Sequence, residues 1–412
     1  MRWPTRSTLR ASLRPIALLF GLFAALSIAV VVMLPSCSQR ALSEAALGSA
    51  YRPPQPTTLD RPSALSSRLL LAGDLHCHVR PPDGADVTRD LERTVVLARE
   101  QHLDFVTFTP HVPERFFADP VARARVAADQ AELRAAIAGA PADAPVLIAG
   151  FEYTDPAYGH VGVAFADLDR VLAAVPLDDA KAHPEHFFEQ WVASGGTLVL
   201  NHPLVTPLDS IFAMARYDLS WRAWTGKGPF PSEIVAINRL AQGAEALNVP
   251  ASTLRDRVLL GDGDHTLVAT FARVDREIVA QHRRITPVGG SDSHGDWVRA
   301  TTYVLAEART AASIHDAIVE GRVCVRSPEA CSFEARTDAG SWRGVGDAIE
   351  GARALQVRAH GDAIEVLLDG EVVARPASDE VAEIAVDPAR CSVLRAHVDT
   401  GFSAPIYVGC GL

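Results

Sequence analysis

The spacing of apolar and polar positions changes repeatedly along the middle of the chain, and it predicts alternating strands and helices. Short apolar runs of strand length recur, starting with Leu69 to Ala72, and helical spacing follows at Leu91, Val95 and Ala98. Repeated strand–helix units are typical of a parallel sheet with helices outside it. The number of units between residues 67 and 328 favours a closed α/β barrel over an open sheet.

The expected helices have recognisable starts and stops. Asp119-Pro120 combines an N-cap side chain with a proline in the first turn, and Gly195-Gly196 ends another helix. Residues 204–265 are less regular and are expected to form an insertion over the barrel mouth. Within it, Trp221 and Trp224 either line the mouth or only pack against neighbouring residues. Strands are expected at 69–72, 104–109, 146–149, 159–165, 197–200, 234–238, 285–290, 301–305 and 322–325, and helices at 87–102, 119–138, 184–194, 267–282 and 311–320.

The pattern changes after Pro328. Short alternating runs are separated by Gly and Asp, and Asp369-Gly370 is a hairpin signal. We therefore expect residues 329–412 to form a small β-sandwich that follows a barrel at 67–328.

The amino terminus has the features of an export signal. Four arginines precede an uncharged apolar stretch from Pro15 to Leu34, and Leu34-Pro35-Ser36-Cys37 follows. This resembles a bacterial lipoprotein signal at 1–36, with a lipid on Cys37 and a flexible tether at 37–66, although Pro35 is atypical. The alternative is an uncleaved membrane anchor. Either interpretation predicts an exported protein held at the bacterial cell envelope, on the periplasmic or outer-membrane face.

Composition narrows the choice of partners. The chain has 412 residues, 48% of them hydrophobic, which is ample for a packed core. Its net charge of -11 argues against a nucleic-acid partner, because phosphate backbones select basic surfaces. A small-molecule substrate is compatible with this charge, and the oligomeric state is left open.

Cysteines suit an oxidising compartment. Apart from Cys37, the chain has Cys77 and four cysteines at or beyond the end of the barrel, Cys324, Cys331, Cys391 and Cys410. Four cysteines allow three pairings, and the sequence does not choose among them. Cys77 is expected to be a buried small apolar residue and not a nucleophile.

Candidate metal ligands follow one predicted strand after another. His76 and His78 lie two residues apart at the end of the first strand, so their side chains share a face, and Asp292 and His294 repeat that spacing. A single histidine is more often a structural residue than a ligand, but six of the fourteen histidines stand at strand ends together with three carboxylates. The nine candidates are His76, His78, Asp83, His111, Glu152, His160, His202, Asp292 and His294.

These residues lie in motifs that resemble the PHP (polymerase and histidinol phosphatase) superfamily of metallohydrolases. The motifs are DLHCHV with PPDG, FVTFTPH, AGFE, GHVG, NHP and GGSDSH, in the family's order. The resemblance implies a distorted (β/α)7 barrel with two or three divalent ions, zinc, manganese or iron. TTYVLAEA, the trailing sandwich and the closing APIYV look like the CehA/McbA branch, named for carbamate and ester hydrolases.

The resemblance also implies a role for each ligand. One metal would be held by His76, His78, Glu152 and Asp292, a second by Glu152, His160 and His202, and a third by Asp83, His111 and His294. Two departures concern the third site: Pro110 stands where the family often has Asp, and Asp83 replaces a His found in some members.

Such a centre supplies hydroxide at neutral pH, because divalent ions lower the pKa of bound water from about 16 to about 7. We therefore expect a hydrolase, with phosphoester cleavage ranked ahead of carboxylester or carbamate cleavage, and with a metal-binding lipoprotein that has no turnover as a third interpretation. Asp292, His294 and His202 are the catalytic candidates. The candidates for substrate contacts are Arg80, Lys227, Asn238 and Arg299.

Overall fold

The computed structural model describes residues 68–204, 220–249 and 265–412. The predicted signal, Cys37 and the tether lie outside these residues, as do residues 205–219 and 250–264 of the predicted insertion. Among the described residues, no helix has the length and apolar character needed to cross a membrane. The helices are α2 (Leu91–Glu100), η1 (Phe116–Ala118), α3 (Pro120–Ala138), α4 (Leu168–Ala174), α5 (Leu177–Ala182), α6 (Glu185–Ala193), α8 (Arg222–Thr225), α9 (Ser232–Leu240), α11 (His265–Gln281), α12 (Ala311–Val319) and η3 (Pro328–Ser332).

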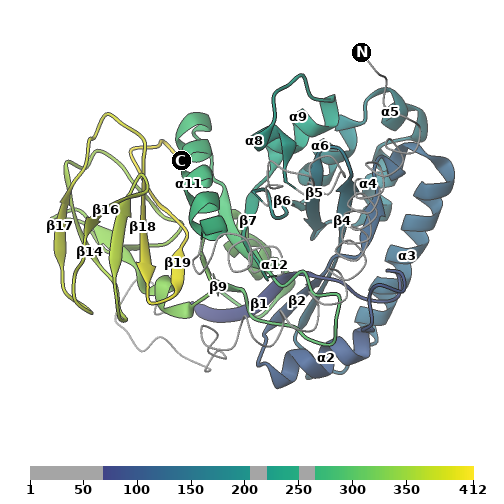
Figure 1. The fold of residues 1–412 in the computed structure, drawn as a ribbon, viewed down its shortest axis with the longest axis horizontal. Helices are drawn as coiled ribbons and strands as arrows, with labels where there is room; N and C mark the ends of the chain where they lie inside the picture. The colour runs from purple at the N-terminus through teal and green to yellow at the C-terminus, as the bar shows by residue number, and fades with distance from the viewer. Residues whose placement is uncertain (1–67, 205–219, 250–264) are drawn as a thin grey trace, which may run out of the picture. The chain divides into compact units, whose positions relative to one another are not determined.

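One large mixed sheet organises the fold (Figure 1). Its path begins in the C-terminal region, passes through β9 and β1, and ends at β8. The strands up to residue 325 are β1 (Leu69–Cys77), β2 (Phe105–Phe108), β3 (His111–Pro113), β4 (Val146–Asp155), β5 (Gly159–Ala164), β6 (Thr197–Leu200), β7 (Gly243–Asn248), β8 (Thr286–Gly290), β9 (Thr302–Ala306) and β10 (Val323–Val325).

The prediction of an entirely parallel sheet is wrong. β1, β2 and β4 are parallel, as are β6, β7 and β8, but β5 is antiparallel to both of its neighbours, and β9 and β10 also run antiparallel. Only residues 156–158 connect β4 to β5, which is enough for a hairpin and too short for a crossover.

The end of β1 meets the segment after β8. Cys77 and Ser293 form an isolated parallel bridge, the Asp292 N–H donates to the His76 carbonyl at 2.8 Å, and the His78 N–H donates to the Ser293 carbonyl at 3.2 Å. The two motifs richest in candidate ligands are therefore joined backbone to backbone. Closure into a seven-stranded barrel stays a prediction.

The large sheet continues into the C-terminal region, because β10 pairs with β19. A second sheet has the order β12-β11-β14-β17, and side chains of the two sheets, such as Val357 and Val366, share one hydrophobic core. A separate sandwich with a boundary at 328 stays a prediction. These strands are β11 (Glu334–Arg336), β12 (Arg343–Gly344), β13 (Ala348–Ile349), β14 (Ala354–Arg358), β15 (Glu365–Leu368), β16 (Glu371–Ala374), β17 (Ala382–Ala385), β18 (Ser392–Val398), β19 (Gly401–Ser403) and β20 (Ile406–Val408).

Local signals in the sequence have structural counterparts. Asp119 caps α3 by accepting from the N–H groups of Val121 and Ala122, and Pro120 occupies the first turn. Asp369 and Gly370 both have positive φ and connect the antiparallel strands β15 and β16, which confirms the hairpin.

The strand predicted at Ile234 to Asn238 is wrong, because this segment lies in helix α9. Ile234 and Ile237 are buried one helical turn apart, whereas Val235 is exposed. A run of four apolar residues fits a buried strand and a buried helix equally well. The strand that follows, β7, was missed because Gly, Ala, Glu and Asn favour strands little.

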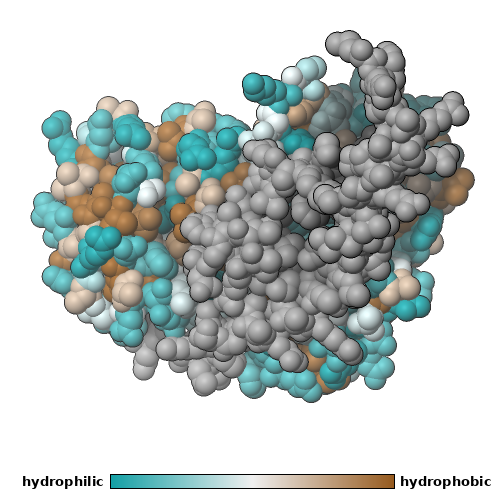
Figure 2. Space-filling model, in the orientation of Figure 1, coloured by the Kyte–Doolittle hydropathy of each residue, from teal (hydrophilic) through white to brown (hydrophobic). Residues whose placement is uncertain are grey.

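The four C-terminal cysteines form Cys324–Cys331 and Cys391–Cys410, one of the three pairings left open. Both bridges are short in sequence, with separations of 7 and 19 residues. At the surface over the C-terminal strands, Figure 2 shows hydrophobic residues among hydrophilic ones, and Val372, Val373 and Val381 are among the exposed apolar side chains of this region.

Candidate metal centre

The end of β1 presents two imidazoles to one side. The Nε2 atoms of His76 and His78 lie 3.2 Å apart. Cys77 between them is fully buried, and its Sγ accepts from the Arg89 guanidinium at 2.9 Å. Burial raises the pKa of the Cys77 thiol to about 12, so this residue stays a neutral thiol, as expected for a structural cysteine.

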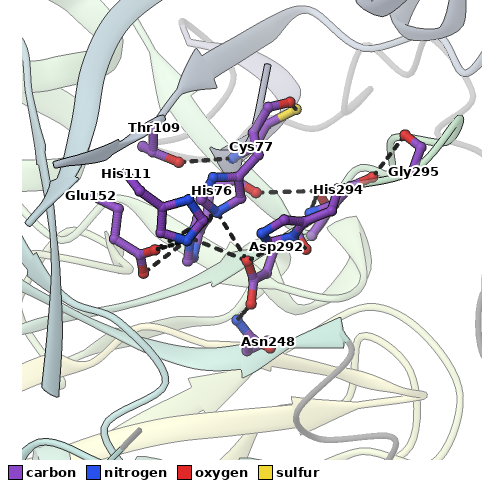
Figure 3. A network of polar contacts seen from close by, with 12 residues as sticks. His76, Cys77, Thr109, His111, Glu152, Asn248, Asp292, His294 and Gly295 are labelled. Atoms are coloured by element: carbon purple, nitrogen blue, oxygen red, sulfur yellow. Dashed lines mark hydrogen bonds and ion pairs between the residues drawn. The ribbon is translucent and has the colours of Figure 1, made fainter. Parts of the chain in front are cut away.

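Glu152 occupies the middle of the candidate ligands. It lies on β4, is 1% exposed, and both carboxylate oxygens face histidines (Figure 3). Burial favours the neutral acid, but the charges of His160 and His76 and the hydrogen bonds from His160 and His202 outweigh burial and hold the Glu152 pKa well below its usual range. The nearest Glu152 oxygen lies 3.3 Å from His76 Nε2, 3.7 Å from His78 Nε2, 3.3 Å from His111 Nε2, 3.2 Å from His160 Nδ1 and 3.4 Å from His202 Nε2.

Asp292 approaches the same two histidines from the segment after β8. Its Oδ1 lies 3.4 Å from His76 Nε2 and 3.1 Å from His78 Nε2. The charge of His76 and the hydrogen bond to His78 outweigh burial and keep the pKa of Asp292 well below its usual range. Asp292 and His202 also have φ of 47° and 31°, left-handed values that cost energy in residues other than glycine. Two candidate ligands are thus held in strained backbone.

Asp83, His111 and His294 surround the other edge of His78. The His78 and His294 rings stack with centroids 4.0 Å apart, and His78 and His111 with centroids 4.2 Å apart. The two oxygens of Asp83 contact the Nδ1 atoms of His78 at 3.0 Å and His111 at 2.9 Å. This contact suits a carboxylate that orients two histidine ligands from behind, and a role for Asp83 as a ligand itself stays a prediction.

The described residues contain three adjacent ligand groups in this region. Within each group, one ligand atom per residue lies within 4.8 Å of the others. His78 belongs to two of them, and Glu152 of the third lies 3.3 Å from His76 and 3.7 Å from His78, so the groups form one continuous centre. The groups are His78, His111 and His294; His76, His78 and Asp292; and Glu152, His160 and His202.

Imidazole and carboxylate donors that converge in this way fit divalent transition ions, and zinc, manganese and iron all accept this donor set. Eight of the nine predicted ligands belong to the three groups. A bound ion would take the place of the contacts that now pair imidazole nitrogens with carboxylate oxygens at 3.1–3.7 Å.

Sequence reasoning missed Glu245 and Asn248 on β7. Glu245 Oε1 lies 3.1 Å from His76 Nδ1, and its Oε2 accepts from the His202 N–H at 2.7 Å. The Asn248 amide donates to both Glu245 Oε2 and Asp292 Oδ2, each at 3.1 Å. Figure 3 shows the contact between Asn248 and Asp292. Gly290 makes room for this contact, because a Cβ there would collide with the Glu245 carboxylate and with His76. No pattern in the sequence pointed to these residues, because no strand was predicted at this segment and a single carboxylate is not a motif.

Arg89 was also missed. It is 1% exposed and lies just before α2, at the junction between the two ligand-bearing segments. Its Nη2 donates to the His78 carbonyl at 2.8 Å and to the Ser293 carbonyl at 3.2 Å, and its Nη1 donates to Ser293 Oγ at 2.9 Å and the Trp297 carbonyl at 2.8 Å. One buried guanidinium therefore fixes the backbones that carry His78, Asp292 and His294.

The predicted substrate contacts are scattered. Arg80 and Lys227 are exposed. Asn238 accepts from Trp221 Nε1 at 3.0 Å on α9, and Arg299 donates to Gln101 Oε1 at 2.7 Å beyond the end of α2. Trp221 and Trp224 are buried, so packing is the role that the structure gives them. Of these four candidates, Arg80 is the nearest in sequence to the centre, two residues after His78.

Asn248→Ala is expected to lower metal affinity or kcat/KM by about 10- to 100-fold, because residues that orient ligands contribute on this scale. The substitution removes the amide that bridges Asp292 and Glu245. Elemental analysis and kinetics at several metal concentrations would measure the loss. Gln356→Ala, which removes a side-chain amide on β14 that accepts a hydrogen bond from Arg336, is the control. Equal behaviour of the two variants would contradict a positioning role for Asn248.

The metal-free protein is expected to lose stability as the pH rises from about 6.5 to about 9. Burial lowers the pKa of His78, but hydrogen bonds to Asp292 and Asp83 outweigh burial and raise it to about 9 from 6.5. A raised folded-state pKa stabilises the protein fully below 6.5, and this contribution disappears as His78 deprotonates.

Thermal unfolding in the presence of a chelator across this pH range would test this expectation. Added metal should flatten the decline, because metals bind neutral imidazole and bind more tightly as pH rises. A metal-free unfolding temperature that stays constant or rises between pH 6.5 and 9 would contradict it.

No protein-family model matches this sequence, and no curated protein matches it. The similar solved structures include a two-domain protein with a predicted PHP-like metal-dependent phosphoesterase from Bacteroides vulgatus, at 16% identity and a TM-score of 0.41, covering 86% of this chain and 99% of that one. They also include a lesion-specific endonuclease from Pyrococcus furiosus, at 14% identity and a TM-score of 0.35, covering 67% of this chain and 64% of that one. An amidohydrolase from Chromobacterium violaceum matches at 14% identity and a TM-score of 0.30, covering 62% of this chain and 99% of that one. At these identities and TM-scores, the matches assign no activity to this chain.

Proposed function

We propose that this protein is a metal-dependent hydrolase with a di- or trinuclear centre, and that it cleaves small phosphoesters. The observation that carries the proposal is the position of Glu152, whose carboxylate faces five histidines from four segments. Glu152 belongs to one ligand group and contacts histidines of the other two. A carboxylate placed in this way can hold two ions about 3.5–4 Å apart, the arrangement that serves phosphatases and nucleases.

When bound, divalent ions would supply Lewis acidity and an activated water at neutral pH. The chain's own residues shape the rest of the site. The side chains of His111, His294 and Asp292 are 33%, 19% and 17% exposed, whereas Glu152 and His202 are almost completely buried. We infer that substrate enters on the side of His111, His294 and Asp292.

The proposed proton-handling residues are Asp292, His294 and His202. Asp292 is ionised, and burial together with the charge of His78 lowers the pKa of His294, so both can accept a proton. His202 has a raised pKa: burial lowers it, but the hydrogen bond and charge of Glu152 outweigh burial. This Nε2 proton is available only while the nitrogen does not bind a metal, so His202 can act as a proton donor only when the Glu152, His160 and His202 group is empty.

A substrate panel tests the proposal. Purified protein loaded with zinc, manganese or iron would be assayed on phosphomonoesters, phosphodiesters, carboxylesters and carbamates, with His76→Ala and Asp292→Asn as inactive controls. Ligand-dependent turnover of phosphoesters supports the proposal. Turnover restricted to carboxylesters or carbamates would replace it with an ester hydrolase, and absence of any turnover in metal-loaded protein would leave a metal-binding protein.

We also propose that the chain is exported and anchored to the cell envelope by a lipid on Cys37, from the motif Leu34-Pro35-Ser36-Cys37. Its substrate would then be a small molecule of the envelope, and nucleic acid is not the expected partner because of the net charge of -11. Mass spectrometry of the membrane-bound protein should give the mass of a chain that begins at a lipid-modified Cys37. The mass of the unprocessed chain would favour the uncleaved anchor.

A further inference from the structure

A second group of metal-ligating side chains lies outside the central site, at the turn between α5 and α6. It consists of His183, Glu185 and His186, and one ligand atom from each lies within 4.8 Å of the others. None of these residues belongs to the nine central candidates. The side chains of His183, Glu185 and His186 are 56%, 24% and 42% exposed, so an ion from solution can reach them.

The backbone holds the two histidines in a fixed relation. The His183 N–H donates to the Asp179 carbonyl at 2.7 Å, and the His186 N–H donates to the His183 carbonyl at 3.0 Å. The rings lie nearly parallel, with centroids 4.9 Å apart and 24° between their planes. Pro184, with φ of -60°, stiffens the turn between them.

Two side chains of this group, His186 and Glu185, each have a polar partner. In both, the partner contacts one polar atom of the side chain and leaves the other available to a metal. Both oxygens of Asp179 contact His186 Nδ1, at 3.2 and 3.0 Å. A carboxylate only accepts, so Nδ1 carries the proton and the Nε2 lone pair remains for a metal. This carboxylate–histidine arrangement is the one that orients histidine ligands in metal sites.

Glu185 is held in the same manner from another element. Ser232, at the start of α9, donates its hydroxyl to Glu185 Oε2 at 2.6 Å. The other oxygen, Oε1, lies 3.6 Å from His183 Nδ1. Ligand atoms around a tetrahedral zinc are roughly 3.4 Å apart, given bonds of about 2.0–2.1 Å, so this pair already has a suitable spacing.

We propose that His183, Glu185 and His186 form a surface site for a divalent transition ion, with Asp179 and Ser232 as orienting partners. Two imidazoles and one carboxylate select zinc, cobalt, nickel or copper over magnesium and calcium, which prefer oxygen donors. The site binds its ion more weakly than the central site, because its three protein ligands are exposed or only partly buried, whereas most of the central ligands are buried. A bound ion joins the end of α5 to the start of α6 and stabilises that turn. This proposal is independent of the hydrolase activity.

The test compares zinc stoichiometry in the parent protein and in the double variant His183→Ala/His186→Ala. Calorimetric titration with zinc and elemental analysis at saturation should show one fewer zinc per chain in the variant. The difference reports on this site whether or not the central site fills. Magnesium should give no difference. His360→Ala removes another exposed, carboxylate-paired imidazole and should keep the parent stoichiometry.

A second variant covers the case in which the double variant folds poorly. Ser232→Ala keeps all three ligands and removes the hydroxyl on Glu185, so zinc should bind roughly 10-fold or more weakly at this site. Equal zinc stoichiometry in the parent and a folded double variant, or equal loss in His360→Ala, overturns the proposal. Unchanged affinity in Ser232→Ala overturns the orienting role.

Discussion

Glu152→Gln is expected to lose more than about 1,000-fold in kcat/KM and at least one metal ion per chain. The substitution preserves size but replaces an ionised carboxylate with a neutral amide at the point where five histidines converge. An amide is a much weaker ligand for divalent transition ions, and it cannot supply the negative charge that offsets two ions. Elemental analysis and kinetics with excess zinc, manganese or iron would measure the loss.

Glu383→Gln is the matched control, because it makes the same chemical change at an exposed position on β17. It should keep both metal content and activity. If Glu152→Gln kept the parent metal content, Glu152 would not be a bridging ligand, and the proposed multinuclear centre would have to be abandoned. Unfolding temperatures of both variants would separate loss of the site from loss of the fold.

Arg89→Met is expected to lower the free energy of unfolding by about 3–5 kcal/mol and to impair metal binding. The substitution removes the donor to the His78, Ser293 and Trp297 carbonyls in a site that is 1% exposed. Each buried acceptor left without a partner costs about 1–3 kcal/mol, and relaxation of the surrounding chain recovers part of the sum. The backbones under His78 and Asp292 would then lose their common anchor.

Arg89→Lys keeps the charge but not the planar guanidinium, so its free energy of unfolding should lie between those of the parent and Arg89→Met. Arg125→Met, at an exposed position on α3, is the control for loss of an arginine. Chemical denaturation monitored by circular dichroism would give the free energies, and elemental analysis the metal content. A change below about 1 kcal/mol in Arg89→Met would contradict the role assigned to this residue.

The candidate ligands could be found from the sequence because they follow simple periodic rules. Residues two apart on a strand share a face, so His76 and His78 had to point the same way, and they lie 3.2 Å apart. Carboxyl ends of neighbouring parallel strands meet at one edge of a sheet, which brought Glu152 near β1. The cap at Asp119 and the turn at Asp369-Gly370 could also be predicted, because each depends only on neighbours along the chain.

The partners of those ligands could not be found in this way. Glu245 and Asn248 come from a strand with weak sequence character, and they contact His76 and Asp292 across separations of 169 and 44 residues. Arg89 contacts Ser293 across 204 residues. Nothing in the sequence around Arg89 distinguishes it from other arginines that precede a helix.

The sequence by itself determined which residues can ligate metal and roughly where the strands and helices lie, because these properties follow from residue chemistry and from periods of two and 3.6 residues. Only the tertiary structure decided the direction of β5, the helical state of Ile234 to Asn238, the cysteine pairing and the residues that hold the ligands in place. These features depend on which distant segments share a core, and burial of a polar group is favourable only where a partner from another segment is already present.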